Sequence, residues 1–549
     1  MSSSKWHWFV TQSSLWKQAS RFCAVTRMLR CFQLDLVVRA AILVSLPVAF
    51  AACGESTLAP TGVRVEVGVD PRVVVGAYPA GTVFVFEAGV HRLLGPIVPR
   101  DGDVFVGEVG AVLNGSRLLT SFERDGGLWV VTGQTQQGRR IGECEPDSPR
   151  CAFPEDLFID DVPLRHVASL ADVGPGAWFF DYENDRIVFA DDPSGRRVET
   201  SVARAAFASA ADDVTIRDLV IEKFANPARP GGAIQAVVTG APSSYGERWI
   251  IENNIVRLNH GAGITAGHGA QIRGNRVLWN GQMGLGGGWG HGTLVEGNEI
   301  AYNNWAGFYQ HWEAGGAKWA MSDGLVVRGN HAHHNRGNGL WTDINNINTL
   351  YEYNVSEYNA RNGIFHEVSY RATIRYNTLQ YNGIERGHEE HRYVDGAGVL
   401  VAHSPDVTVY GNVVKGNWNG IIGLQGNRGS GTYGAYEIRN LSVYDNDIEV
   451  RYWPDGYSLR GRPEGVHGRS GVFRNGGFDG VWDEEANNRF DRNRYTILTD
   501  TTRHWFWANA DRDFAAWQAF GQDQQSILAG SLTNGTDAHY KLDQSQTRR

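Results

Sequence analysis

The sequence is poor in charged residues and has no basic excess. Lys and Arg together number 51 and Asp and Glu 60, so charged residues make up only 20% of the 549 and the formal net charge is −9. A nucleic-acid partner would call for a clustered basic surface, and this composition argues against one. The 67 Gly, 18 Trp and 20 Tyr instead indicate a turn-rich β protein rather than a disordered chain.

The apolar run at Ala40–Ala52 is too short to span a membrane. It has 13 residues and ends in small side chains before Cys53, which is typical of a signal-peptide core. The segment AFAAC resembles a bacterial lipobox, which implies a lipid anchor on Cys53 at the mature N-terminus. Because Phe50 stands where that motif usually has Leu, plain secretion remains the alternative. We therefore expect a secreted or cell-envelope protein.

Cysteine is scarce as well. The five are Cys23, Cys31, Cys53, Cys144 and Cys151. In an exported protein Cys144 and Cys151 face an oxidising compartment, and only six residues separate them in CEPDSPRC. We predict that they form a small disulfide loop.

A repeat of Asn and Gly runs from about residue 214 to 450. Its frame is Asn, a second Asn five residues later and Gly four residues after that. The clearest copies are Asn275, Asn280, Gly284; Asn298, Asn303, Gly307; Asn330, Asn335, Gly339; and Asn354, Asn359, Gly363. Periods of about 22 to 35 residues with short β-type runs and no amphipathic helices predict an all-β, right-handed, single-stranded parallel β-helix.

This fold makes two further predictions about packing. The stacked Asn side chains should hydrogen-bond to the backbone and to each other along the stack. Leu340, Ile364 and Phe308 should lie inside the β-helix.

The repeat also divides the chain. We predict an N-terminal extension with its signal segment over 1–53, a linker and first coils over 54–121, a small inserted β domain over 122–205, the β-helix with its active face over 206–450, and last coils with a C-terminal cap over 451–549. The short β runs from about residue 61 to 120 resemble the opening coils of pectate-lyase-like proteins. The segment DFAAWQAFGQDQQS should cap the last coil.

Two segments of the repeat, GLWTD and GIFHE, align at an offset of 24 residues, which places Asp343 over Glu367 and Trp341 over Phe365. Since side chains on a strand alternate faces, these four should share an outer surface. Counting from Gly307, the same column adds Tyr309 and His311 one coil earlier. The coils on either side carry small or aliphatic residues at these positions, so the central coils form the candidate site.

Two coils of the repeat are lengthened, and both insertions border this column. They contain HWEAGGAKWAMSDG and GIERGHEEHRYVDGAG. Long loops on a solenoid usually surround its binding face. The column and these loops give the candidate substrate-binding residues, which are His311, Tyr309, Trp341, Phe365, His366, Trp312, Glu313, His403 and Arg392.

The paired carboxylates of Asp343 and Glu367 suit glycoside hydrolysis. Neighbouring parallel strands lie about 4.8 Å apart, and retaining glycosidases hold their two carboxyl groups about 5 to 5.5 Å apart. Close like charges raise one pKa, which supplies an acid beside an ionised nucleophile. A calcium site would need more oxygen ligands than this column supplies. We predict catalysis by this pair without a metal or other cofactor, acting on a carbohydrate substrate.

The segment GLWTD followed by GIFHE, with Asn-rich turns between them, resembles the catalytic core of glycoside hydrolase family 120. That family consists of retaining β-xylosidases on a parallel β-helix with a small inserted β domain. The resemblance implies that Asp343 is the nucleophile and Glu367 the acid/base.

Two other classes of function remain open at this point. A lyase or epimerase acting on uronate polymers would draw its base from Lys318, His391, Arg392 or a Tyr, although an acid pair facing an anionic substrate is a poor fit. A noncatalytic solenoid that binds glycans would use the aromatic side chains and would not need the carboxylates.

Overall fold

The computed structural model describes residues 61–228, 231–237, 245–383, 394–451, 468–476, 479–498 and 503–531. All of them belong to one compact unit, Pro60–Gly535. In this part of the chain no helix is both long and apolar enough to cross a membrane. The predicted signal segment and Cys53 lie outside the described residues.

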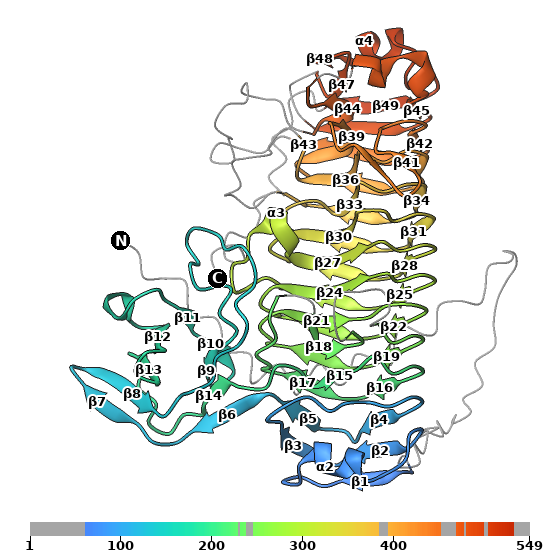
Figure 1. The fold of residues 1–549 in the computed structure, drawn as a ribbon. Coiled ribbons are helices and arrows are strands. Elements are labelled where there is room, and N and C mark those ends of the chain that lie inside the picture. Colours follow the sequence, from blue (N-terminus) through green and yellow to red (C-terminus); the bar gives the residue numbers. More distant parts are fainter. Residues whose placement is uncertain are drawn as a thin grey trace, which may run out of the picture. The chain divides into compact units, whose positions relative to one another are not determined.

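Three long sheets wind around one core, and each coil of the central stack adds one strand to each sheet (Figure 1). The first sheet is β1 (Val63–Val65), β2 (Val83–Phe86), β4 (Val104–Gly107), β16 (Thr215–Arg217), β19 (Ile250–Glu252), β22 (Gln271–Arg273), β25 (Leu294–Glu296), β28 (Val326–Arg328), β31 (Thr349–Glu352), β34 (Ala372–Arg375), β37 (Val407–Tyr410), β42 (Ser442–Tyr444) and β45 (Arg489–Asp491).

The second sheet is β3 (Gly89–Arg92), β5 (Ala111–Asn114), β17 (Val220–Glu222), β20 (Ile255–Arg257), β23 (Arg276–Leu278), β26 (Glu299–Ala301), β29 (His331–His333), β32 (Val355–Glu357), β35 (Thr378–Gln380), β38 (Val413–Lys415), β43 (Asp447–Arg451), β46 (Arg494–Leu498) and β49 (Ile527–Ser531).

The third sheet carries the candidate site. It is β15 (Phe207–Ala208), β18 (Gly232–Gln235), β21 (Ala262–Thr265), β24 (Met283–Gly288), β27 (Gly315–Ala320), β30 (Asn338–Asp343), β33 (Ile364–Glu367), β36 (Ala397–Ala402), β39 (Asn419–Gln425), β44 (Ser470–Arg474), β47 (Trp505–Trp507) and β48 (Ala510–Arg512). Its strands pair in parallel except for the last two. The predicted parallel β-helix is confirmed.

Asn side chains form continuous ladders at the turns between sheets, as predicted. The side chain of Asn335 donates to Oδ1 of Asn359 at 2.9 Å, and Asn359 donates in turn to Oδ1 of Asn382 at 2.9 Å. The same amide of Asn359 also reaches the carbonyl oxygen of Ala332 at 3.0 Å. These buried side-chain amides form hydrogen bonds with backbone groups of the turns that would otherwise lack partners. This requirement explains why Asn recurs at the same position of each repeat.

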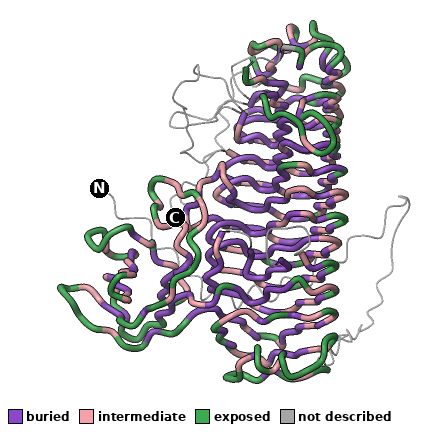
Figure 2. Tube along the Cα trace, in the orientation of Figure 1, coloured by how far each residue is buried: buried purple, intermediate pink, exposed green. Residues whose placement is uncertain are grey.

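The core is a column of aliphatic and aromatic side chains inside the coils, and Figure 2 shows the strands of the stack largely buried. Leu340 and Ile364 lie in it, as predicted. Phe308 is buried too, but in a separate cluster with Cys151. Its predicted place inside the β-helix is therefore wrong, because the loop that carries it turns outward against the inserted domain.

The inserted domain, residues 116–201, contains two small sheets. One orders β10 (Val162–Pro163), β9 (Leu157–Ile159), β14 (Val198–Ser201) and β6 (Ser116–Leu119), and the other orders β11 (Arg165–His166), β12 (Ala177–Asp181), β13 (Arg186–Phe189), β8 (Leu128–Thr132) and β7 (Glu123–Asp125). The predicted disulfide between Cys144 and Cys151 is formed. A small inserted β domain near the N-terminus is thus confirmed.

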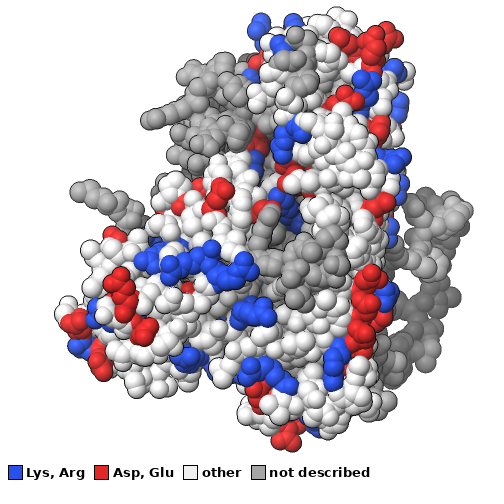
Figure 3. Space-filling model, viewed as in Figure 1, with Lys and Arg blue, Asp and Glu red and all other residues white. Residues whose placement is uncertain are grey.

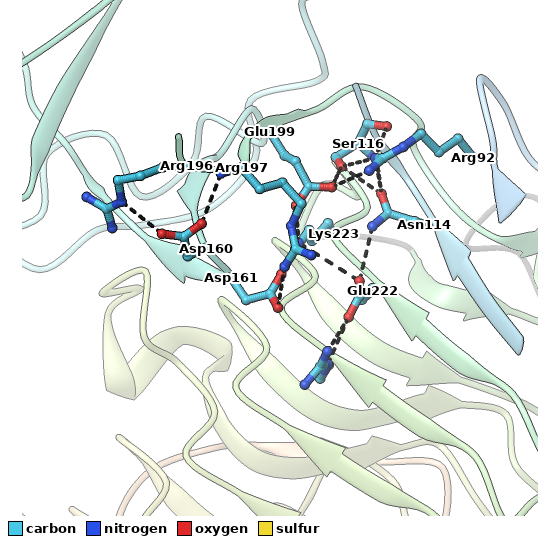
Figure 4. Close-up of polar contacts among 11 residues, drawn as sticks. Arg92, Asn114, Ser116, Asp160, Asp161, Arg196, Arg197, Glu199, Glu222 and Lys223 are labelled. Carbon is cyan, nitrogen blue, oxygen red and sulfur yellow. Dashed lines mark hydrogen bonds and ion pairs between the residues drawn. The ribbon is translucent and has the colours of Figure 1, made fainter. Parts of the chain in front are cut away.

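A buried ion network joins this domain to the coils (Figure 4). Lys223, just after β17, and Glu199, in β14, are each 1% exposed, and their side chains pair directly. Lys223 also pairs with Asp161. Arg92, in β3, reaches Glu199 at 2.7 Å. Buried charges are tolerated only when they are paired in this way.

Three short α-helices occur among the described residues. They are α2 (Pro71–Gly76) beside the first coil, α3 (Gln310–Glu313) ahead of β27, and α4 (Phe514–Ala519) near the last coils. The side chain of Asp513 caps α4 by accepting from the amide of Ala516 at 2.8 Å. Trp517 of α4 is fully buried in the core cluster. The closing segment thus contributes Trp517 to the core, and its role as a cap stays a prediction.

Candidate active site

Asp343 and Glu367 are register partners on the adjacent parallel strands β30 and β33. The same pairing joins Trp341 to Phe365, so the offset of 24 residues found in the sequence is the true register. Adjacent strands lie about 4.8 Å apart. The two carboxylates therefore leave the same face of the sheet one strand apart.

The coil before Asp343 differs from the prediction. In β27 Lys318 pairs with Trp341 and Trp319 with Thr342, so the next position, beside Asp343, is Ala320. The sequence frame had placed His311 there. It is wrong for this coil because residues 307–314 form a loop with α3, and the strand begins at Gly315.

Lys318 is the cation that this frame shift brings into the site. Its Nζ lies 2.8 Å from Oδ2 of Asp343 and 3.2 Å from Oε1 of Glu313. It also sits 3.8 Å above the ring of Trp341, and its side chain is 8% exposed. The ammonium group of Lys318 thus lies directly against one oxygen of Asp343. Within the described residues, the other oxygen, Oδ1, is buried without a hydrogen-bond partner.

Glu367 is the second carboxylate of the site. Burial, followed by the charge of Asp343, raises its pKa to about 7. The nearby cations Arg428, Lys318 and Arg361 oppose this shift without cancelling it. The site thus holds one carboxylate fixed by a lysine and another that keeps its proton up to neutral pH.

Arg428 contacts Glu367 from a loop that follows β39. Its guanidinium lies 3.1 Å from Oε1 of Glu367. The loop contains β40 (Ser430–Gly431) and β41 (Gly434–Ala435) and reaches back across two coils. The hydroxyl of Tyr370 donates to the carbonyl oxygen of Gly434 at 2.8 Å and holds the loop in place. Sequence reasoning missed Arg428, since no repeat links it to Glu367.

The aromatic column is not an open surface. Trp341 and Phe365 stack with ring centroids 5.5 Å apart, but they are only 3% and 6% exposed. They pack in a cluster with Leu400, Ile422 and Phe473. The predicted solvent-exposed aromatic strip that binds sugar is therefore wrong. These rings form the apolar floor beneath Lys318 and the carboxylates.

His366 and His403 have different environments. His366 is fully buried, and its two ring nitrogens contact Oγ1 of Thr342 at 2.7 Å and the carbonyl oxygen of Tyr370 at 3.1 Å. Its predicted role in substrate binding is wrong, because residues adjacent on a strand face opposite sides. His403, just after β36, is 6% exposed, and within the described chain its Nδ1 has no hydrogen-bond partner. Its role stays a prediction.

The remaining candidates come from the two lengthened coils. Tyr309, His311 and Trp312 lie on the loop with α3, whose backbone pairs with the inserted domain through the amide of Tyr309 and the carbonyl oxygen of Glu143 at 2.8 Å. Trp312 packs in the cluster around the disulfide. Glu313 reaches the carboxylate pair through Lys318.

Arg392 and His391 lie outside the described residues. In the described chain no group of three or more His, Cys, Asp or Glu is arranged to hold a metal ion. Lys318, Glu313 and Arg428 form ion pairs around the carboxylate pair.

Comparison with known proteins supports the fold. A family model described as the right-handed β-helix region matches residues 239–414. The solved structure of XylC in complex with xylose is 14% identical, with a TM-score of 0.60 over 85% of this chain and 84% of that chain. The A-modules of the Azotobacter vinelandii mannuronan C-5 epimerases AlgE6 and AlgE4 are 14% and 13% identical, with TM-scores of 0.46 and 0.42 over 86% of this chain and 95% and 97% of theirs.

No curated protein sequence matches the chain. At these identities a structural likeness shows the fold alone. Together with the three parallel sheets, the comparisons confirm that this chain folds as a right-handed parallel β-helix.

Proposed function

We propose that the protein is a carbohydrate-active enzyme, a retaining glycoside hydrolase that uses Asp343 and Glu367. The observation that carries this proposal is their pairing in register on adjacent strands. A spacing of about 4.8 Å between strands agrees with the roughly 5 to 5.5 Å between the carboxyl groups of retaining enzymes. XylC, the neighbour with a TM-score of 0.60, was solved with xylose, which supports a sugar ligand.

The environments of the two carboxylates assign their roles. Lys318 holds Oδ2 of Asp343 and so orients the carboxylate that attacks the anomeric carbon. Glu367, whose pKa is raised to about 7, donates its proton to the departing glycosidic oxygen. This step forms a bond from Asp343 to the sugar and breaks the bond to the leaving group. In the second step Glu367 takes a proton from water, which displaces Asp343 and retains the configuration.

A lyase or epimerase is less well supported by the same contacts. Such an enzyme needs a base that can take a proton from the sugar ring, and Lys318 was the candidate on this face of the helix. Its ammonium group forms ion pairs with both Asp343 and Glu313, and a base at this position would have to give up both contacts.

The test of the proposed function is product stereochemistry combined with two variants. Purified protein is screened against aryl glycosides, and the anomer first released is identified by NMR. Glu367→Ala should lose turnover by orders of magnitude, recover partly on substrates with activated leaving groups, and form a glycosyl azide of retained configuration with azide. Asp343→Ala should not recover on substrates with activated leaving groups and should not form a glycosyl azide.

Asp445→Asn is the matched control, since among the described residues this exposed carboxylate forms its ion pair with Arg492 on a distant turn. It should leave turnover unchanged. A first product of inverted configuration would reject the nucleophile role of Asp343. An unsaturated product that absorbs in the ultraviolet would identify a lyase instead.

We also propose export to the cell envelope or medium. The disulfide between Cys144 and Cys151 supports this, since such bonds persist in oxidising compartments. Cleavage before Cys53, with or without lipid on that residue, would produce the mature protein.

A further inference from the structure

The inserted domain presents two arginines over a group of aromatic rings. The guanidinium carbon of Arg140 lies 4.1 Å from the ring centre of Phe153 and 4.7 Å from that of Tyr182. The guanidinium of Arg150 lies 4.3 Å from the same Phe153 ring and 5.4 Å from that of Phe179. These three rings are partly exposed. We call these five residues the arginine–aromatic surface.

In the part of the chain that the structure describes, the two arginines of this surface form no ion pair with a carboxylate. Three other arginines of the inserted domain, Arg186, Arg196 and Arg197, pair with carboxylates, as Arg186 does with Asp181 and Arg196 with Asp160. Among the described residues, no carboxylate forms an ion pair with Arg140 or Arg150. Burial lowers the pKa of Arg150, and the charge of Arg140 lowers it further. Two cations held together without a counterion are costly, and an anionic ligand would remove that cost.

A hollow adjoins the surface. It is lined by Pro149, Arg165, Val167, Ala168 and Asp172 and has a volume of about 280 Å³. Arg150 follows Pro149 in the chain and donates to the carbonyl oxygen of Ala168, a lining residue, at 3.0 Å. Arg165 adds a third cation, and Asp172, which accepts from the hydroxyl of Ser169 at 2.7 Å, is the acid in its wall. Figure 3 shows basic side chains gathered on this part of the molecule.

We propose that the arginine–aromatic surface binds an acidic oligosaccharide whose carboxylates pair with Arg140 and Arg150. Guanidinium groups bind carboxylates through paired hydrogen bonds, and partly exposed aromatic rings offer apolar faces to sugar rings. A long polyanion such as nucleic acid fits less well. Residues 116–201 contain 16 Asp and Glu against nine Arg and no Lys, so the cationic surface is small and suits a short acidic ligand better than an extended one.

The test is calorimetric titration of the full-length mature protein with oligogalacturonides, and with neutral oligosaccharides of equal length. The wild-type protein should bind the acidic series at least about tenfold more tightly, and added salt should weaken that binding. Arg140→Gln combined with Arg150→Gln should lose about tenfold or more in affinity. Arg140→Gln alone should lose part of this affinity. Because Arg140 is exposed, the single variant should fold normally, and it tests the proposal even if the double variant misfolds.

Arg124→Gln is the matched control. Arg124 belongs to the same domain and lies 4.4 Å over the ring of Trp129, but it stands apart from the paired arginines. It should bind like wild type, and so should Asp343→Asn, which separates this surface from the proposed active site. Equal affinity for acidic and neutral sugars would overturn the proposal, as would unchanged binding in the double variant. Displacement of the sugar by equimolar inorganic sulfate would show that the surface binds anions in general, and this result would also overturn the proposal.

Discussion

Replacing Glu367 with Gln should stabilise the protein at high pH but not at low pH. Burial and the charge of Asp343 raise the pKa of Glu367 from an ordinary 4.5 to about 7 in the folded state. At 1.36 kcal/mol per pKa unit this amounts to about 3 kcal/mol. The side chain is only 15% exposed, so solvent screens little of this free energy.

The sign of the effect follows from proton binding. Below pH 4.5 both folded and unfolded chains hold the proton, and the stability contributed by Glu367 is fully present. As the pH rises toward 7, the unfolded chain releases its proton first, and that stability is lost. Gln has no proton to release. The stability of Glu367→Gln relative to wild type should therefore rise by about 3 kcal/mol between pH 4 and pH 8.

The assay is urea unfolding followed by tryptophan fluorescence at both pH values. Glu437→Gln is the control, because this carboxylate is 42% exposed and pairs with Arg439 on the surface. Its effect on stability should change little with pH. The measured quantity is the free energy of unfolding of Glu367→Gln minus that of wild type. If it stays constant or falls from pH 4 to pH 8, Glu367 is not the carboxyl group that keeps its proton.

Four further predictions follow from the site, the ladders and the signal segment. Lys318→Met leaves two buried carboxylates without their cation, so urea unfolding at pH 8 should show a loss of about 3 to 5 kcal/mol; an unchanged midpoint would contradict this. Arg428→Gln removes a charge that lowers the pKa of Glu367, so the basic limb of kcat/KM against pH should move to higher pH. Asn359→Ala interrupts a buried ladder and should cost about 1 to 3 kcal/mol for each group left unsatisfied, measured by the same unfolding assay. Mass spectrometry of the mature protein from its native host should show residues 1–52 missing, and an intact N-terminus would count against export.

The local repeat could be predicted from the sequence because each coil must satisfy the same buried turn backbone and does so with the same residue type. Buried turn amides need partners, so Asn recurs at a fixed phase, and the ladder bond from Asn335 to Asn359 follows directly. The pairing of Asp343 with Glu367 could be predicted for the same reason, since the coil between them has no insertion. Strand alternation also placed both carboxylates on one face.

Only the tertiary structure decided what surrounds the two carboxylates. The loop before β27 shifts the frame, so Lys318 rather than His311 reaches the site, and a loop's length does not say where the next strand begins. Arg428 arrives from a coil far along the chain. Burial of Trp341 depends on side chains contributed by other coils, which no local pattern records. The sequence by itself thus determined the coil, its register and the acid pair, while packing between distant segments determined the charges and the solvent access on which their chemistry depends.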